Sequence, residues 1–132
     1  MIKTLTGIIV LFLVISCKND DALSVNTIEG EWKLIAVLAD PGDGSGEFRS
    51  VSSNKTVRFN ANGSYTSNGK ICDFSSLADD ESEGIYVATD QGYSIECEGQ
   101  FVYPVNLQLK DGFLIITFFC IEPCQHKYKK VG

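Results

Sequence analysis

Two cysteines and the chain's only histidine lie close together near its end, and these residue types could do chemistry. Cys120, Cys124 and His126 could form a cysteine nucleophile with its base, or part of a zinc site. Zinc needs three or four ligands, and a nucleophilic cysteine needs a free thiolate and a group that orients its base. We therefore favour a disulfide beside a surface histidine, and predict no metal site and no catalytic residue here.

Carboxylates are the second group that could support catalysis or hold a cation. They gather in the glycine-rich segment 40–47, in the run 79–83 and at Glu96 and Glu98. The first segment does not match the calcium loop of an EF-hand, and charge runs are usually solvated loops. Glu96 and Glu98 alternate with other residues as on the outer face of a sheet. We predict that the protein is not an enzyme and has no cofactor.

A further cysteine, Cys17, ends an apolar run near the start of the chain. Lys3 supplies a positive charge, residues 5–15 are mostly apolar, and Ser16 is small. A charged start, an apolar core and a small-residue end are typical of an export signal. The run is shorter than the about 20 apolar residues that span a bilayer. We therefore predict a signal peptide over residues 1–16.

The residues that lead into Cys17 suggest how the exported chain is held. Val14, Ile15 and Ser16 before Cys17 resemble the lipobox of bacterial lipoproteins. The resemblance implies cleavage before Cys17, a diacylglycerol on its sulfur and a third acyl chain on its amine. Several chains are needed because each buried methylene contributes only about 0.8 kcal/mol to membrane binding. The alternatives are an ordinary secretory signal, or an uncleaved helix with Cys17 as a bystander.

A short polar segment separates Cys17 from the rest of the chain. Lys18-Asn19-Asp20-Asp21 resembles the lysine-plus-acidic signal that sends some lipoproteins to the surface of the outer membrane, although a solvated linker is the alternative. We expect residues 17–27 to be the lipidated cysteine and its tether, and residues 28–132 to be the folded domain. The predicted location is the outer membrane, lipid-anchored, on its periplasmic or cell-surface face.

Composition narrows the possible partners. The net charge is −6, and loss of the signal peptide with Lys3 makes it −7, so the acidic domain should repel nucleic acid. A remainder of about 115 residues is one domain with a single core. No second long apolar run occurs, so the N-terminal lipid is the expected membrane attachment.

The cysteines after Cys17 predict cross-links. Cys72, Cys97, Cys120 and Cys124 are an even number in an exported domain, which favours two disulfides. Four cysteines allow three pairings, and sequence alone does not choose among them. We favour Cys72–Cys97 with Cys120–Cys124, the second of which requires a tight turn between its cysteines.

Alternating apolar and polar residues indicate that β-strands position the cysteines, the histidine and the carboxylates described above. Alternation marks nine candidate segments, among which we expect about eight strands: residues 32–39, 56–59, 64–67, 70–74, 85–89, 93–97, 101–109, 113–120 and 124–131. Trp32, Leu34, Ala36 and Leu38 should share one face of the first strand. Short strands with tight turns indicate an all-β antiparallel meander, closed into a barrel or folded into a sandwich. Closure is favoured because it removes exposed edges.

Two motifs in this meander resemble a known family. Gly30-Glu31-Trp32 is similar to the Gly-x-Trp signature of lipocalins, and Cys120-Ile-Glu-Pro-Cys124 followed by residues 127–130 is similar to lipocalin-like lipoproteins of bacteria. The resemblance implies an eight-stranded barrel in which Trp32 plugs the closed end. No arginine lies near the end of the chain to cover the tryptophan, so one of the lysines at 127, 129 or 130 would have to serve.

The aromatic residues are the candidate ligand-binding groups. If the barrel has a cavity, it should be lined by Phe59, Tyr65, Tyr93, Phe101, Tyr103 and Phe119. An eight-stranded barrel is just wide enough for its own side chains or one small ligand, so these rings could equally fill it. We therefore expect an envelope lipoprotein that binds a small apolar ligand or a partner protein. The alternative is a structural or interaction module, or an inhibitor, with a filled barrel.

Overall fold

The computed structural model describes residues 26–99 and 102–132, and every regular element in them is a β-strand. The strands are β1 Gly30–Ala39, β2 Arg49–Ser50, β3 Thr56–Phe59, β4 Ser64–Ser67, β5 Ser82–Ile85, β6 Val87–Thr89, β7 Gly92–Ile95, β8 Val105–Lys110, β9 Phe113–Thr117 and β10 Cys124–Lys130. The predicted signal peptide, Cys17 and most of the tether lie outside the described residues. Within them, no helix is long and apolar enough to cross a membrane.

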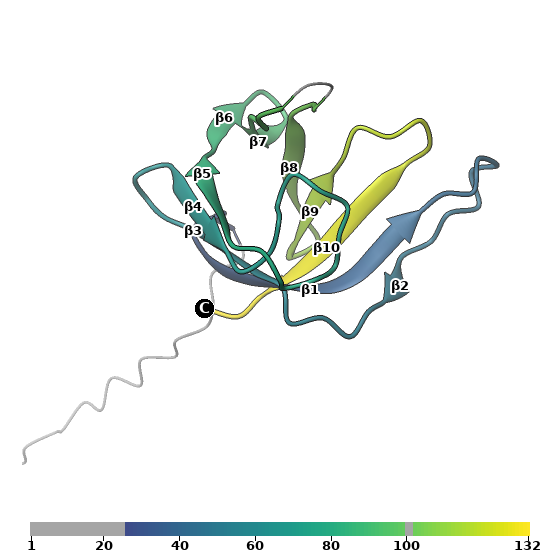
Figure 1. The fold of residues 1–132 in the computed structure, drawn as a ribbon, viewed down its shortest axis with the longest axis horizontal. Coiled ribbons are helices and arrows are strands. Elements are labelled where there is room, and N and C mark those ends of the chain that lie inside the picture. Colours follow the sequence, from purple (N-terminus) through teal and green to yellow (C-terminus); the bar gives the residue numbers. More distant parts are fainter. Residues whose placement is uncertain (1–25, 100–101) are drawn as a thin grey trace, which may run out of the picture.

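The strands form one antiparallel sheet that curls into a nearly closed barrel. Their order is β5-β4-β3-β1-β10-β9-β8-β7-β6, and β2 pairs beside β1. The two edge strands β5 and β6 are separated only by Tyr86 and follow one another along the wall (Figure 1). Because β5 pairs with β4 and β6 pairs with β7, together they act as one bent strand that completes the wall. Counted in this way, the wall has the predicted eight strands in meander order.

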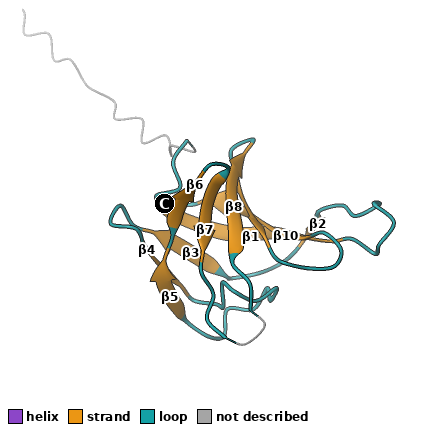
Figure 2. Cartoon of the chain, turned by 90° about the horizontal axis from the view of Figure 1, so that it is seen from above, coloured by secondary structure: helices purple, strands orange, loops and turns teal. Residues whose placement is uncertain are grey.

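The two ends of the barrel differ in their connections. Tight turns at 60–63, 90–91 and 111–112 lie at one end, here called the turn end. Asp111 and Gly112 have φ of 53° and 81°, as a two-residue hairpin turn requires. Longer connections, including 40–48 and 68–81, lie at the other end, here called the loop end. The 40–48 connection extends with β2 to one side of the barrel (Figure 2).

Side chains pack the interior along the whole barrel. The buried apolar core is formed by Ile28, Trp32, Leu34, Val57, Phe59, Tyr65, Ile71, Ile95, Val105, Leu107, Leu114, Ile116, Phe118, Cys124 and Tyr128. Each buried side chain of this size contributes about 1.5–3 kcal/mol relative to exposure. The barrel is therefore held by a packed core to which every strand except β2, β5 and β6 contributes.

A β-bulge in β1 corrects the predicted inward face. The pairing with β10 shifts between Leu34 and Ala36. Beyond the shift, Ala36 lies opposite Lys127 on the outer face, while Val37 lies opposite His126 and packs against the core. The prediction that Ala36 and Leu38 share a face with Leu34 is wrong, because the extra residue reverses the alternation.

Two predicted strands also differ from the structure. Residues 70–74 form no strand, because the partner of β4 is Ser82–Ile85, of which all but Ile85 was expected to lie in an acidic loop. The strand expected over 101–109 begins at Val105, directly after Pro104, which has no backbone N–H for a ladder. Phe101 lies outside the described residues.

Candidate functional site

Both predicted disulfides are present at the loop end. Cys72–Cys97 joins the 68–81 connection to the segment after β7, with Cα atoms 5.8 Å apart. Cys120–Cys124 closes the β9–β10 connection, with Cα atoms 6.1 Å apart. All four sulfurs are therefore bonded, and none is a free thiolate that could act as a nucleophile.

Trp32 closes the turn end. Its side chain is fully buried, and Nε1 donates a hydrogen bond to the Ile28 carbonyl at 2.8 Å. Lys130 lies opposite Trp32 in the β1–β10 ladder and places its ammonium 5.2 Å from the ring centre. Lys130 also donates to the Thr27 carbonyl at 3.2 Å. Of the three lysines considered from the sequence, Lys130 is the one over the tryptophan.

The five aromatic candidates that the structure describes do not line a common cavity. Phe59 and Tyr65 are buried in the core, and Tyr93 packs against it. Tyr103 and Phe119 lie on the surface with their rings stacked 4.0 Å apart. Both residues lie beyond strand ends, since β8 begins at Val105 and β9 ends at Thr117, so the alternation of a strand no longer directs them inward.

These two rings belong to an exposed apolar surface at the loop end. A hollow of about 230 Å³ there is lined by Phe74, Val102, Tyr103, Phe118 and Phe119, with Asp73 at its border. Phe74, Val102, Tyr103 and Phe119 are exposed, and we call them the loop-end patch. Tyr103 is 49% exposed and Phe119 is 70% exposed, which is unusual for rings of this size.

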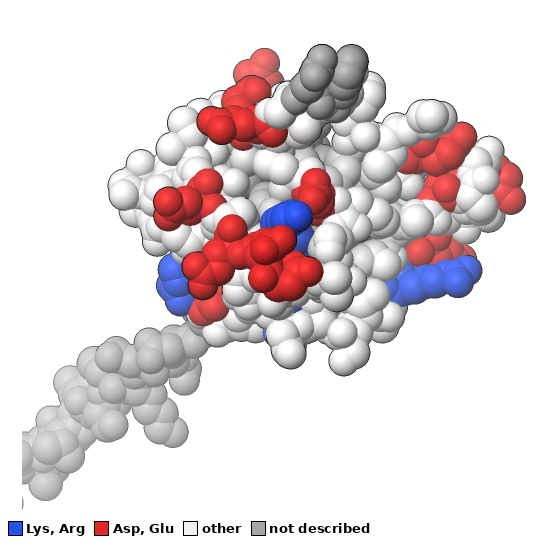
Figure 3. Space-filling view, viewed as in Figure 1, with Lys and Arg blue, Asp and Glu red and all other residues white. Residues whose placement is uncertain are grey.

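Acidic residues border the loop-end patch. Lys70 Nζ lies 3.2 Å from an Asp80 oxygen and 3.9 Å from an Asp73 oxygen. Figure 3 shows red side chains gathered around a blue one near the middle of the face, where the 68–81 connection runs in Figure 1. Lys70 and the buried Lys55 thus accompany Asp73, Asp79 and Asp80, so carboxylates outnumber lysines by one at this border of the patch.

His126 lies beneath the patch, inside the barrel. Its ring is fully buried, 4.7 Å from the Phe74 ring and 4.8 Å from the Phe118 ring between centres. Neither imidazole nitrogen has a hydrogen-bond partner among the described residues, and the same holds for the Tyr128 hydroxyl. Burial, with a smaller contribution from the Lys55 charge, lowers the pKa of His126 to about 3. The expected surface histidine is wrong, because alternation along β10 directs this residue inward with Tyr128.

Lys55 is a second buried polar group, which the sequence did not reveal. Its Nζ donates hydrogen bonds to the carbonyl oxygens of Lys70 and Ser75, the latter at 2.6 Å. Burial lowers the pKa of Lys55 to about 8, although nearby Asp73 and Asp79 oppose the shift. Lysine is rarely buried without hydrogen-bond partners. The burial of Lys55 is explained by these two carbonyl oxygens, which come from the 68–81 connection and lie far from Lys55 along the chain. Lys55 fastens that connection over the loop end.

The carboxylate-rich segment 40–47 folds around Asp40. Asp40 Oδ1 accepts backbone hydrogen bonds from Gly42, Asp43 and Gly44, and Oδ2 accepts one from Gly46 at 3.0 Å. These bonds, led by that from Gly42, lower the pKa of the Asp40 carboxyl. Both Asp40 carboxylate oxygens therefore accept hydrogen bonds from backbone amides, and these bonds hold the 40–47 loop in shape.

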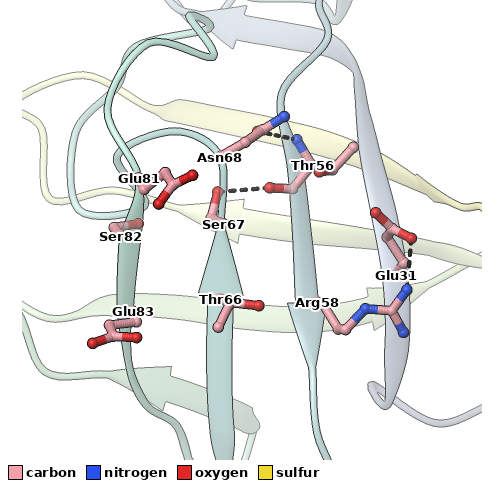
Figure 4. A pocket seen from close by; sticks show the side chains of 9 residues that line it. All are labelled: Glu31, Thr56, Arg58, Thr66, Ser67, Asn68, Glu81, Ser82 and Glu83. Atoms are coloured by element: carbon pink, nitrogen blue, oxygen red, sulfur yellow. Dashed lines mark hydrogen bonds and ion pairs between the residues drawn. The ribbon is translucent and has the colours of Figure 1, made fainter.

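A polar hollow lies on the outer wall across β1, β3, β4 and β5 (Figure 4). Arg58 and Glu31 form an ion pair of 2.8 Å on one side of it, and Glu81 and Glu83 lie on the other. Ser67 Oγ donates to the Thr56 carbonyl at 2.6 Å. Because the ion pair is solvent-exposed, it contributes at most about 1 kcal/mol to the free energy of unfolding. We interpret this hollow as ordinary solvated barrel surface.

No family model matches the chain, and no curated protein or solved structure is significantly similar to it. The lipobox before Cys17 and the lipocalin signature at Trp32 therefore stay predictions. The barrel itself agrees with the fold that the second resemblance implies.

Proposed function

We propose that the chain is a lipid-anchored lipoprotein of the cell envelope that binds a partner protein through the loop-end patch. The observation that supports this most is the exposed Tyr103–Phe119 ring stack at one end of a packed barrel. Soluble monomers seldom expose contiguous apolar surface of this kind unless something binds it. Rigid aromatic side chains are also the residues that most often dominate the energy of a protein interface.

The direction of the chain fits this role. The described chain enters the barrel beside Trp32 at the turn end, since Ile28 accepts the tryptophan's hydrogen bond. The loop-end patch lies at the opposite end of the strands. A lipid on Cys17 would therefore hold the turn end towards the membrane and present the patch away from it.

The border of the patch indicates the partner's chemistry. Asp73 lines the hollow beside the aromatic rings, and Lys70 faces both Asp73 and Asp80. A matching partner surface would place an apolar side chain in the hollow and basic side chains around it. Such charge complementarity chiefly raises the association rate and falls with ionic strength.

A paired capture experiment tests the proposal. The full chain is cross-linked in native membranes and compared with the double variant Tyr103→Ser, Phe119→Ser. The control is Ile85→Ser, which removes an exposed apolar residue from the barrel wall. We expect the double variant to lose a salt-sensitive adduct that the control retains. Equal adducts in all three proteins, or none in the wild type, would reject the patch as a docking surface.

A small apolar ligand inside the barrel is the second candidate, and the unpartnered atoms of His126 and Tyr128 favour it. A neutral imidazole and a hydroxyl could bind a ligand's polar group if Phe74 moved aside. Native mass spectrometry of the purified full chain would reveal a retained ligand as added mass. A spectrum that contains only the lipidated chain would argue against this candidate.

A further inference from the structure

A second hollow, on the outer wall, combines rings and ammonium groups. It has a volume of about 320 Å³, and Phe48, Phe113, Lys110, Lys127, Gln108 and Gln125 line it. Five of these residues belong to β8, β9 and β10, and Phe48 comes from the connection that precedes β2. We call it the Phe48 hollow. It lies outside the barrel and shares none of these residues with the loop-end patch.

The hollow is held in shape by elements that are distant in sequence. Phe48 directly precedes β2, whose Arg49 pairs with Val37 of β1. The Val51 N–H adds a hydrogen bond to the Ile35 carbonyl at 3.0 Å, and Asp40 organises the start of the same connection. Phe48 is therefore fixed over the sheet by backbone pairing on one side and a folded loop on the other.

Lys127 occupies the centre of this arrangement. It lies opposite Ile115 in the β9–β10 ladder, on the outer face of the barrel. Its ammonium is 4.2 Å from the centre of the Phe48 ring and 5.2 Å from that of Phe113. Among the described residues, the ion pairs found involve Arg58 and Lys70, so no carboxylate forms an ion pair with Lys127. Aromatic faces attract the ammonium but do not cancel its charge.

The remaining lining groups define what the hollow can take. Lys110 adds a second positive charge, against which Asp111 is the one carboxylate of the lining. The amide of Gln108 donates to the Gln91 carbonyl at 3.2 Å, and that of Gln125 donates to Thr117 Oγ1 at 3.0 Å. Both amide groups are thereby held in place. The hollow is thus locally positive in a protein whose net charge is −6.

We propose that the Phe48 hollow binds a small amphipathic anion, an apolar or aromatic body that carries one carboxylate or phosphate. The rings of Phe48 and Phe113 would contact the body, and the Lys127 ammonium would bind the anionic group. A free carboxylate or phosphate compound and a lipid headgroup share this chemistry. Uncharged and cationic analogues lack the group that Lys127 recognises.

Calorimetry with matched probes tests the proposal. The full chain in phosphatidylcholine nanodiscs is titrated with phenylacetate, phenyl phosphate, 2-phenylethanol and phenethylamine, and with soluble dihexanoyl phosphatidic acid. We expect an anion to bind and the alcohol and amine to bind at least tenfold more weakly. Binding only by the phosphatidic acid would identify a lipid as the source of the anion, whereas binding by the phenyl anions would identify a free compound.

Variants assign the binding to Lys127. Lys127→Met keeps an unbranched apolar side chain and removes the charge, and it should weaken anion binding by about 10- to 100-fold. Lys129→Met removes an exposed lysine from the same strand face and should change nothing. Thermal unfolding of each variant checks that it folds, and Lys127→Arg should retain binding. Anion binding that survives in a folded Lys127→Met protein, or no binding by any anion, would overturn the proposal.

Discussion

At the scale of single residues, the effect of Tyr128 on the free energy of unfolding depends on whether anything inside the barrel binds its hydroxyl. Its ring is fully buried, and its hydroxyl has no hydrogen-bond partner among the described residues. A buried polar group without a partner lowers the free energy of unfolding by about 1–3 kcal/mol. Burial also raises the pKa of this hydroxyl, so it stays neutral.

We therefore predict that Tyr128→Phe raises the free energy of unfolding by about 1 kcal/mol, because it removes an unsatisfied hydroxyl and keeps the ring. Urea unfolding of the full chain measures the change. Tyr86→Phe is the control, since the Tyr86 hydroxyl donates to the Asn60 carbonyl at 2.6 Å and its loss should lower stability. A loss of stability in Tyr128→Phe would mean that a ligand or water binds the hydroxyl.

His126 predicts a pH dependence of stability. Its imidazole takes up a proton near pH 6.5 in the unfolded chain, but only near pH 3 in the fold. Between these values the unfolded state binds more protons, so the free energy of unfolding falls as the pH falls. We expect a loss of up to about 2 kcal/mol between pH 7 and pH 5 in urea unfolding. A His126→Leu variant should lack this loss, and an equal loss in the variant would assign it to other groups.

At the scale of elements, the two disulfides should contribute unequally to stability. Cys72–Cys97 spans 25 residues and Cys120–Cys124 spans 4. A cross-link that closes a longer loop restricts the unfolded chain more. We predict that Cys72→Ala with Cys97→Ala lowers the free energy of unfolding by about 3 kcal/mol, and that the Cys120→Ala, Cys124→Ala pair costs about 2 kcal/mol. Thermal unfolding in both double variants tests the order, and a reversed order would contradict it.

The elements that were predictable from the sequence are those whose signals are local. Asp111-Gly112 carries the positive φ values that a hairpin turn needs, and β3 and β4 were found with their observed bounds. The bulge at residues 34–36 was not predictable, because a register shift depends on the partner strand. The choice of Ser82–Ile85 over residues 70–74 as the partner of β4 depends equally on non-local pairing.

The candidate site was only partly predictable for the same reason. The even number of cysteines predicted two disulfides, but the sequence did not decide the pairing, which the structure shows. The Gly-x-Trp motif drew attention to Trp32, which is fully buried at the turn end. Tyr103 and Phe119 were expected inside the barrel, and their exposure depends on where β8 and β9 end. The burial of Lys55 depends on carbonyls some 15 and 20 residues away along the chain. Period-two alternation identifies strands, but it does not place side chains beyond a bend or a strand end.

At the scale of the whole molecule, the two ends of the barrel carry different features. Trp32 and Lys130 close the end at which the described chain enters, and the disulfides and exposed rings gather at the other. The interior between them is packed. These features together support the proposal that the protein acts through its loop end and that a lipid anchor would hold its opposite end towards the membrane.

Site-specific photo-cross-linking in the native host tests this account most directly. A photoreactive phenylalanine analogue replaces Phe119 in one strain and Ile85, on the wall, in another. We predict a discrete protein adduct from position 119 that disappears when Tyr103→Ser is added, and no such adduct from position 85. The absence of an adduct at position 119, or the same adduct from both positions, would contradict it.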